Sequence, residues 1–221
     1  ESAAAARKLF VDTSETLRSL VIKNKKANEV GALMGVLDQI TMALVDILEP
    51  TDALVPKARF NLAETYFELG QFDRATQQYR WVVENWKDAK GFDPATAALR
   101  AIASRYETLK ARNIVPSSLS ARVQGKDAPK PDAALVEWLA WIDAYKAKDK
   151  GGDENARKTF LNYSFEANRA LYAAGDVNGA SQRLLEFVDG APASEFAVPS
   201  ASLVLDTRIL GEEWKTSYDL I

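Results

Sequence analysis

Apolar residues recur at helical spacing in two adjacent stretches between residues 56 and 87, and a single glycine separates the stretches. The recurring residues are Leu62, Ala63, Tyr66 and Phe67 before Gly70, then Phe72, Ala75, Tyr79, Val82 and Val83 after it. Glycine readily adopts the positive φ at which many helices end, so the pattern predicts two antiparallel helices joined by a short turn. One such pair cannot bury its apolar faces alone, and we therefore expect further pairs stacked against it.

Weaker helical periodicity covers most of the remaining chain. The expected helical segments are residues 2–28, 30–48, 94–112, 133–148, 156–192 as a second hairpin, and 197–221. Between them, residues 113–132 lose the periodicity and are dominated by Pro, Ser, Gly and charged residues. We expect an inserted loop there, because the helix that follows supplies a partner for the helix before it; a domain boundary is the alternative. The pattern as a whole predicts an all-α fold.

The stretch from residue 56 to residue 87 resembles the tetratricopeptide repeat (TPR), a helix–turn–helix unit of about 34 residues. Its signature positions are filled in one register by Asn61, Leu62, Ala63, Tyr66, Gly70, Phe72, Ala75, Tyr79 and Val82. Arg59 stands where the repeat usually has an aromatic residue, and Lys87 stands where it usually closes with proline. The resemblance implies a right-handed superhelical array of antiparallel helix pairs, a TPR-like solenoid that spans residues 1–221 as one domain.

Four further segments fit this array as degenerate or partial repeats. They are residues 1–50, 94–148 with the inserted loop, 156–192, and the partial repeat 197–221. In the 156–192 repeat Gly175 is the turn glycine, and Asn168 replaces the usual small residue, which predicts looser or different packing. The spacing from the clear repeat to the next one is about forty residues, longer than the usual 34. Such long units resemble bacterial envelope repeat proteins, which favours a periplasmic or outer-membrane-associated location; a cytoplasmic adaptor is the alternative.

The composition narrows the function classes. The chain has 221 residues, of which 47% are hydrophobic and 27% charged, a balance typical of globular proteins. The net charge of −3 and the lack of a dense basic stripe give no indication of nucleic-acid binding. No apolar run approaches the length of a membrane span, so we expect no membrane insertion within this segment. Cysteine and histidine are absent, which excludes disulfides, thiolate nucleophiles and imidazole chemistry, and we expect no cofactor.

Carboxylates are the remaining candidates for chemistry. Glu212 with Glu213, and Asp12 with Glu15, lie close together in sequence, but adjacent residues on a helix point in different directions and exposed acidic residues are common. The acidic turn at residues 148–155 offers oxygen ligands without the alternating order of a calcium-binding loop, which indicates a polar turn. We therefore expect no metal site and no enzyme activity.

The resemblance to the tetratricopeptide repeat also implies where a partner binds, because helix A of each pair lines the inside of the array. The helix-A positions that usually meet the ligand are Phe60, Glu64, Phe67 and Glu68 in the clear repeat, and Phe165, Arg169 and Tyr172 in the 156–192 repeat. Such an acidic and aromatic groove with one arginine suits an extended or helical peptide that has apolar anchors and some positive charge. The alternative for Phe67 and Phe165 is that they pack between repeats.

Three functions remain open from the sequence. The first is a non-catalytic scaffold that binds a protein or peptide partner on the concave helix-A surface. The second is a structural subunit of a bacterial envelope complex, with contacts through the loop at 113–132 and the ends of the array. The third is an all-α enzyme with a carboxylate site, for which no convergent acid, base and nucleophile is present. The chain starts at Glu1 rather than Met and ends in an expected helix, so we expect it to be part of a larger multi-repeat protein.

Overall fold

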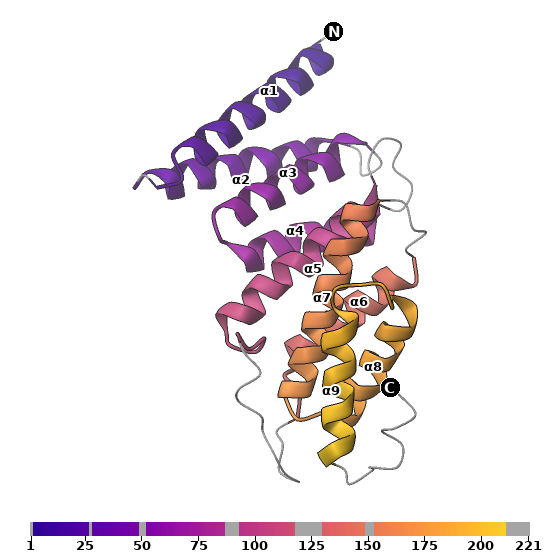
Figure 1. Cartoon of the computed structure of the whole chain (residues 1–221). Coiled ribbons are helices and arrows are strands. Elements are labelled where there is room, and N and C mark those ends of the chain that lie inside the picture. The colour runs from indigo at the N-terminus through magenta and orange to yellow at the C-terminus, as the bar shows by residue number, and fades with distance from the viewer. Residues whose placement is uncertain are drawn as a thin grey trace. The chain divides into compact units, whose positions relative to one another are not determined.

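A computed structural model of the chain describes the fold, and every regular element among the residues that it describes is a helix. Those residues are 2–26, 28–48, 52–86, 93–117, 130–148 and 153–210. Several neighbouring helices form antiparallel pairs (Figure 1), which confirms the predicted all-α fold of helix pairs. The chain divides into two compact units, unit 1 (Glu1–Arg105) and unit 2 (Tyr106–Ile221), and their boundary falls inside α5 (Pro94–Ala111).

Unit 1 is built from two helix pairs and the first part of α5. Its pairs consist of α1 (Ser2–Lys23), α2 (Val30–Ile47), α3 (Leu54–Glu68) and α4 (Phe72–Asn85). α1 packs on α2 and α3, and α3 packs on α2 and α4. The shared core contains Val21, Met34, Leu37, Leu62, Ala63, Tyr66, Ala75, Tyr79 and Ala101. Every helix of the unit therefore contributes to one core, as expected for helix pairs that bury their apolar faces on each other.

Two short hydrogen-bonded turns confirm the predicted turn glycines. Gly70 has a φ of +71°, which glycine adopts without strain. Its N–H donates to the carbonyl of Phe67 at 2.9 Å, and the N–H of Gln71 donates to the carbonyl of Tyr66 at 2.9 Å. These bonds satisfy carbonyls at the end of α3 and lead the chain directly into α4. The equivalent Gly175 of unit 2 has a φ of +90°.

Arg59 fills the place of the missing aromatic residue. Its guanidinium carbon lies 4.2 Å from the centre of the Trp81 ring, and its Nη1 donates to Gln78 Oε1 at 2.8 Å. Burial lowers the pKa of Arg59, and the nearby carboxylates of Asp46 and Asp38 oppose that shift. A guanidinium stacked on tryptophan covers apolar surface much as a ring would, so this departure from the repeat signature still joins α3 to α4.

Unit 2 contains the end of α5 and four further helices. These are α6 (Ala133–Lys146), α7 (Glu154–Ala173), α8 (Val177–Gly190) and α9 (Ala197–Leu210). The side chains of Asp132, Asp153 and Asp176 accept backbone N–H groups and so cap the starts of α6, α7 and α8. α7 packs on α6 and α8, and it is buried without a break over residues 167–172. α7 is therefore the central helix of unit 2.

Asn168, which stands where the repeat usually has a small residue, is buried on α7 and accepts a hydrogen bond from α8. Its Oδ1 accepts a hydrogen bond from Arg183 Nε of α8 at 2.9 Å. The same guanidinium donates to both carboxylate oxygens of Asp143 on α6, at 2.9 and 2.6 Å. A polar bridge thus joins three helices where the clear repeat has only Ala63, so the packing differs as the sequence predicted.

α2 corrects the expectation that no apolar run approaches a membrane span. Its 18 residues have a mean hydropathy of 1.6, and by length and composition it is the one helix in the described ranges that could cross a membrane. Only 22% of this helix is buried, although it packs on α1 and α3. Gly31 and Gly35 interrupt the large apolar side chains of this run, so the sequence pattern alone did not indicate its length. α2 combines one packed face with another that unit 1 leaves uncovered.

Parts of the expected loop and of the last repeat lie outside the described residues. Of the segment 113–132, the structure describes residues 113–117, where Val115 is buried, and residues 130–132. The expected helix around Trp214 and the carboxylates of Glu212 and Glu213 lie beyond residue 210. The arrangement as one domain and the role of the loop stay predictions.

Candidate functional site

The predicted contact residues of the clear repeat lie together on one side of α3. Phe60, Glu64, Phe67 and Glu68 follow one another at the spacing that places helical residues on a single face. The first three are half-buried and Glu68 is exposed. We call these four residues the α3 face. The structure therefore brings all four together, and each keeps some surface in contact with solvent.

Both phenyl rings of the α3 face are anchored by other rings. The ring centroid of Phe60 lies 5.4 Å from that of Tyr79, and the centroid of Phe67 lies 5.2 Å from that of Phe72, both in edge-to-face geometry. Both residues also pack against the core of unit 1. The rings thus have fixed positions while one part of each stays accessible.

Glu64 is held by two partners. Tyr79 donates its hydroxyl hydrogen to Glu64 Oε1 at 2.5 Å, and Arg100 Nε lies 3.2 Å from the same oxygen. The side chain of Glu64 keeps only 19% of its surface exposed. Burial and the Glu64 carboxylate raise the pKa of Tyr79, and the guanidinium groups of Arg100 and Arg18 partly oppose this rise. Glu64 is therefore a structural carboxylate whose negative charge is already paired with Arg100 within unit 1.

Arg100 was not among the predicted contact residues, although the sequence contained a signal for it. When Ile102 of α5 is aligned with Leu62 of α3, Arg100 takes the helix-A position that Phe60 has in the clear repeat. The side chain of Arg100 remains 48% exposed beside the α3 face. The same repeat position therefore supplies a ring from one helix and a cation from the next.

Glu68 carries the accessible charge of the α3 face. Its side chain is 50% exposed and pairs with Lys25, with 3.7 Å between Lys25 Nζ and Glu68 Oε2. A pair at this distance between exposed groups contributes little to stability. The Glu68 carboxylate is therefore available to a ligand.

The equivalent residues of unit 2 are covered by the chain itself. Phe165 is buried and stacks on Phe196, with ring centroids 5.3 Å apart. Arg169 is buried, and its guanidinium donates to the Pro116 carbonyl at 2.7 Å as well as to Glu166 Oε2. We call Phe165, Arg169 and Tyr172 the α7 face.

Tyr172 completes this closed surface. Its hydroxyl donates to Asp206 Oδ2 of α9 at 2.5 Å, and its ring is buried. The structure therefore brings Phe165, Arg169 and Tyr172 together along α7, but α9 and the residue Pro116 occupy the space that a ligand would need. For Phe165, the alternative that it packs inside the array describes what is observed.

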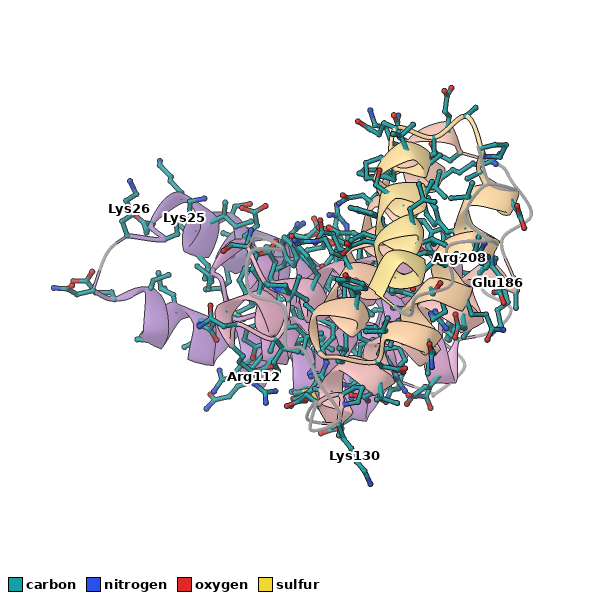
Figure 2. All side chains as sticks on the ribbon, turned by 60° about the horizontal axis from the view of Figure 1, so that its bottom comes forward. Lys25, Lys26, Arg112, Lys130, Glu186 and Arg208 are labelled. Carbon is teal, nitrogen blue, oxygen red and sulfur yellow. The ribbon has the colours of Figure 1, made fainter. Side chains whose placement is uncertain are left out.

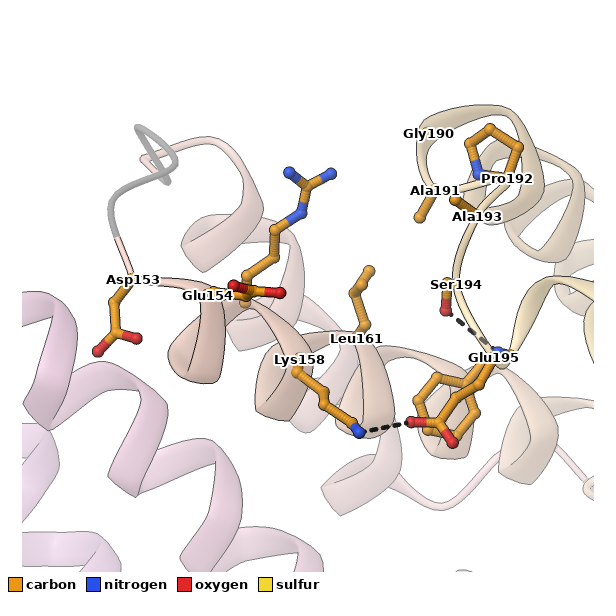
Figure 3. A pocket seen from close by; sticks show the side chains of 12 residues that line it. Asp153, Glu154, Lys158, Leu161, Gly190, Ala191, Pro192, Ala193, Ser194 and Glu195 are labelled. Atoms are coloured by element: carbon orange, nitrogen blue, oxygen red, sulfur yellow. Dashed lines mark hydrogen bonds and ion pairs between the residues drawn. The ribbon is translucent and has the colours of Figure 1, made fainter.

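A hollow of about 820 Å³ lies elsewhere in unit 2, between the start of α7 and the connection from α8 to α9 (Figure 3). Lys158 and Glu195 face each other across it, with 3.2 Å between Nζ and Oε1, and Leu161 points toward the connection. Asp153 also lines it, but its carboxylate accepts the N–H groups of Asn155 and Ala156. The hollow has mixed charge and no convergent set of reactive groups.

Among the described residues, the carboxylates considered for chemistry are not assembled into a site. Asp12 and Glu15 are exposed on α1, and Glu212 and Glu213 lie outside the described residues. Among the residues that the structure describes, no group of three or more acidic, histidine or cysteine side chains could hold a metal ion. The shifted pKa values belong to helix-packing residues such as Tyr79 and Tyr106, whose pKa burial raises.

Comparisons with known proteins add a likeness of fold. The chain matches no protein-family model and no curated protein. Two solved structures are similar to this chain, each with a TM-score of 0.48 and 15% sequence identity. Each alignment covers 93% of this chain and 90% of the solved chain. They are nearly identical TPR-like repeats from Podosopora anserina, described as a kinesin light chain, and a single-residue variant of the same repeats. The α3–α4 and α7–α8 pairs, each with its glycine turn, have the helix–turn–helix form that the resemblance to the tetratricopeptide repeat implied.

Proposed function

We propose that this chain is a non-catalytic scaffold that binds a peptide segment of another protein along the α3 face. The observation that carries the proposal is the contrast between two equivalent helix faces. The α7 face holds a phenyl ring, a backbone carbonyl and a carboxylate, all supplied by the chain itself. A peptide offers the same three kinds of group, and the α3 face presents the matching positions with exposed surface.

The chemistry of the α3 face favours a peptide with apolar anchors and a basic residue. Phe60 and Phe67 offer fixed ring edges to the anchors, and anchored rings lose little entropy on binding. Glu68 offers an accessible carboxylate to a lysine or arginine of the ligand. Arg100, half-exposed beside Glu64, is placed to contact a peptide carbonyl or carboxylate.

Selection of peptides from a random displayed library on the intact chain tests this function. Glu68→Lys reverses the accessible charge without removing a core contact, and Asp189→Lys changes an exposed aspartate on α8 as the matched control. We expect selected peptides to carry apolar and basic residues and to lose about tenfold in affinity, about 1.4 kcal/mol, toward Glu68→Lys alone. Peptides that bind both variants and the native chain equally would show that the α3 face is not the site.

The location in a bacterial envelope is a separate proposal, supported by the spacing of about forty residues between repeats. Fractionation of the native cells with an antibody against the chain tests it. We expect the protein in the periplasmic or outer-membrane fraction, and its recovery in the cytoplasmic fraction would contradict this location. The alternative role as an assembly subunit depends on the loop at 113–132, most of which lies outside the described residues.

A further inference from the structure

The outer side of α2 is an apolar surface that unit 1 leaves uncovered. Val36 is 44% exposed and Ile47 is 69% exposed, both high values for large aliphatic side chains. The residues on this side are Gly31, Ala32, Gly35, Val36, Gln39 and Ile47, which we call the α2 outer face. A helix that is apolar on nearly all sides is normally covered on all sides, so we expect another surface to cover this face.

Three small residues, Gly31, Ala32 and Gly35, lie near the start of the α2 outer face, and the large Ile47 lies at its end. A Cβ atom added to Gly31 or Gly35 would meet nothing within 4 Å, so the described chain does not use the space beside either glycine. If a second α2 lies antiparallel with Gln39 opposite Gln39, then Gly31 faces Ile47 of the other copy. In the same register Gly35 faces Ala43. Ile47 of each copy thus meets the free space beside Gly31 of the other, and the small pair of Gly35 and Ala43 lets the two helices approach closely.

The charges at the two ends of α2 favour the same antiparallel arrangement. Lys25 and Lys26 extend from the turn that precedes α2 (Figure 2), and Asp46 is exposed at the opposite end. Antiparallel helices bring the lysines of one copy near Asp46 of the other and oppose the two helix dipoles. A parallel arrangement would place lysine beside lysine and aspartate beside aspartate.

We propose that the α2 outer face binds the same face of a second copy of this chain, as an antiparallel twofold dimer. Gln39 lies on the twofold axis, where the two side-chain amides can donate to and accept from each other. A lipid surface fits less well, because Gln39 and the exposed Asp46 would lose their hydration there without a partner. A single helix pair makes a small interface, so we expect association in the micromolar range. Of the α3 face, only Glu68 is linked to this dimer, through its ion pair with Lys25.

Single-cysteine variants test the register cleanly, because the native chain has no cysteine. In the predicted dimer Gln39→Cys places two thiols at the axis, Ile47→Cys places them at opposite ends, and Ser202→Cys is the control on α9. At micromolar concentration under mild oxidation, we expect Gln39→Cys to form disulfide-linked dimers at least about tenfold faster than either other variant. Rates equal to the Ser202→Cys control would overturn the dimer, and equally fast linkage through Ile47→Cys would overturn its antiparallel register.

Sedimentation velocity supplies a test that needs no new covalent bond. Val36→Asp puts a charge on the α2 outer face, whereas Val198→Asp puts one on α9 at a valine that is 77% exposed. We expect Val36→Asp to raise the dissociation constant of the dimer about tenfold or more with unchanged helicity, and Val198→Asp to leave it unchanged. A native chain that stays monomeric at 100 times the expected micromolar range, or that instead floats with phosphatidylcholine vesicles, would refute the proposal.

Discussion

The α3 face and the α7 face start from the same repeat positions and end in different environments. Phe60 is half-buried beside Tyr79, whereas its counterpart Phe165 is buried against Phe196. Glu64 on the α3 face accepts a hydrogen bond from the Tyr79 hydroxyl and pairs with Arg100. Its counterpart Arg169 on the α7 face instead donates to the backbone carbonyl of Pro116. Repeat position alone therefore does not make a binding surface; what matters is whether another segment of the chain covers it.

Charge offers a physical reason for the openness of the α3 face. Arg100 of α5 pairs with Glu64 while its side chain stays 48% exposed, and an exposed guanidinium favours contact with water. On α7 the cation Arg169 instead has its hydrogen bonds satisfied by Glu166 and Pro116, which makes its burial tolerable. The α3 face thus stays partly exposed, whereas the α7 face is part of the interior.

The largest contrast is expected at the aromatic position. Phe165→Ala removes a buried ring and leaves a cavity beside Phe196, so we expect a loss of about 4 kcal/mol in the free energy of unfolding. Phe60→Ala removes a ring that is partly solvated, and we expect a loss of about 1.5 kcal/mol. Urea unfolding followed by far-ultraviolet circular dichroism measures both losses. Similar values for the two variants would mean that the faces do not differ in burial.

The next contrast lies at the charged position. Arg169→Ala leaves the Glu166 carboxylate and the Pro116 carbonyl without their partner, and we expect a loss of about 3 kcal/mol in the free energy of unfolding. Glu64→Gln keeps an oxygen for the Tyr79 hydroxyl and removes only the charge, so we expect a loss below about 1 kcal/mol. The same urea measurements apply. A larger loss for Glu64→Gln than for Arg169→Ala would reverse the account.

Sequence reasoning located most helices closely, because their ends carry local signals. Pro94 begins α5, as expected for a residue that has no N–H to leave unpaired. Gly70 forms the turn that follows α3, with a positive φ. The burial of the α7 face could not be predicted from such local signals. Its covering groups come from 53 residues away in the bond from Arg169 to Pro116, and from 34 residues away in the bond from Tyr172 to Asp206. Side chains that meet at such separations leave no periodic pattern in the sequence.

A third effect appears only in alkaline solution. Burial and the Asp38 carboxylate raise the pKa of Tyr66 to about 12, whereas the equivalent residue of α7 is Leu171. An unfolded tyrosine ionises near pH 10, so between about pH 10 and 12 the folded chain binds more protons than the unfolded chain. The contribution of Tyr66 to stability is therefore complete below about pH 10 and is lost as the pH rises through about 12.

Tyr66→Phe should reduce this alkaline loss of stability, because phenylalanine does not ionise. Urea unfolding of the native chain and the variant at about pH 9 and about pH 11 measures the difference in slope. Leu171→Met, a volume-conserving change at the matched position, should leave the slope unchanged. A variant that loses as much stability as the native chain over this range would show that Tyr66 ionises normally.

The smallest contrast concerns one hydroxyl group. Tyr172→Phe removes the hydrogen bond to Asp206 on a buried side chain, and we expect a loss of about 1.5 kcal/mol in the free energy of unfolding. Phe67→Tyr adds a hydroxyl to the matched ring of the α3 face, where solvent can accept it, so we expect a change below about 0.5 kcal/mol. Urea unfolding resolves the two values. A neutral Tyr172→Phe would indicate that Asp206 does not close the α7 face.

Hydroxyl-radical footprinting of the native chain, read by mass spectrometry, tests the central contrast most directly because it needs no substitution. Aromatic side chains oxidise in proportion to their exposure, so we expect Phe60 and Phe67 to oxidise several times faster than Phe165. A selected peptide should then slow the oxidation of Phe60 and Phe67 and leave Phe165 unchanged. Equal oxidation of Phe60 and Phe165 in the free chain, or protection of Phe165 alone by the peptide, would contradict an open α3 face and a closed α7 face.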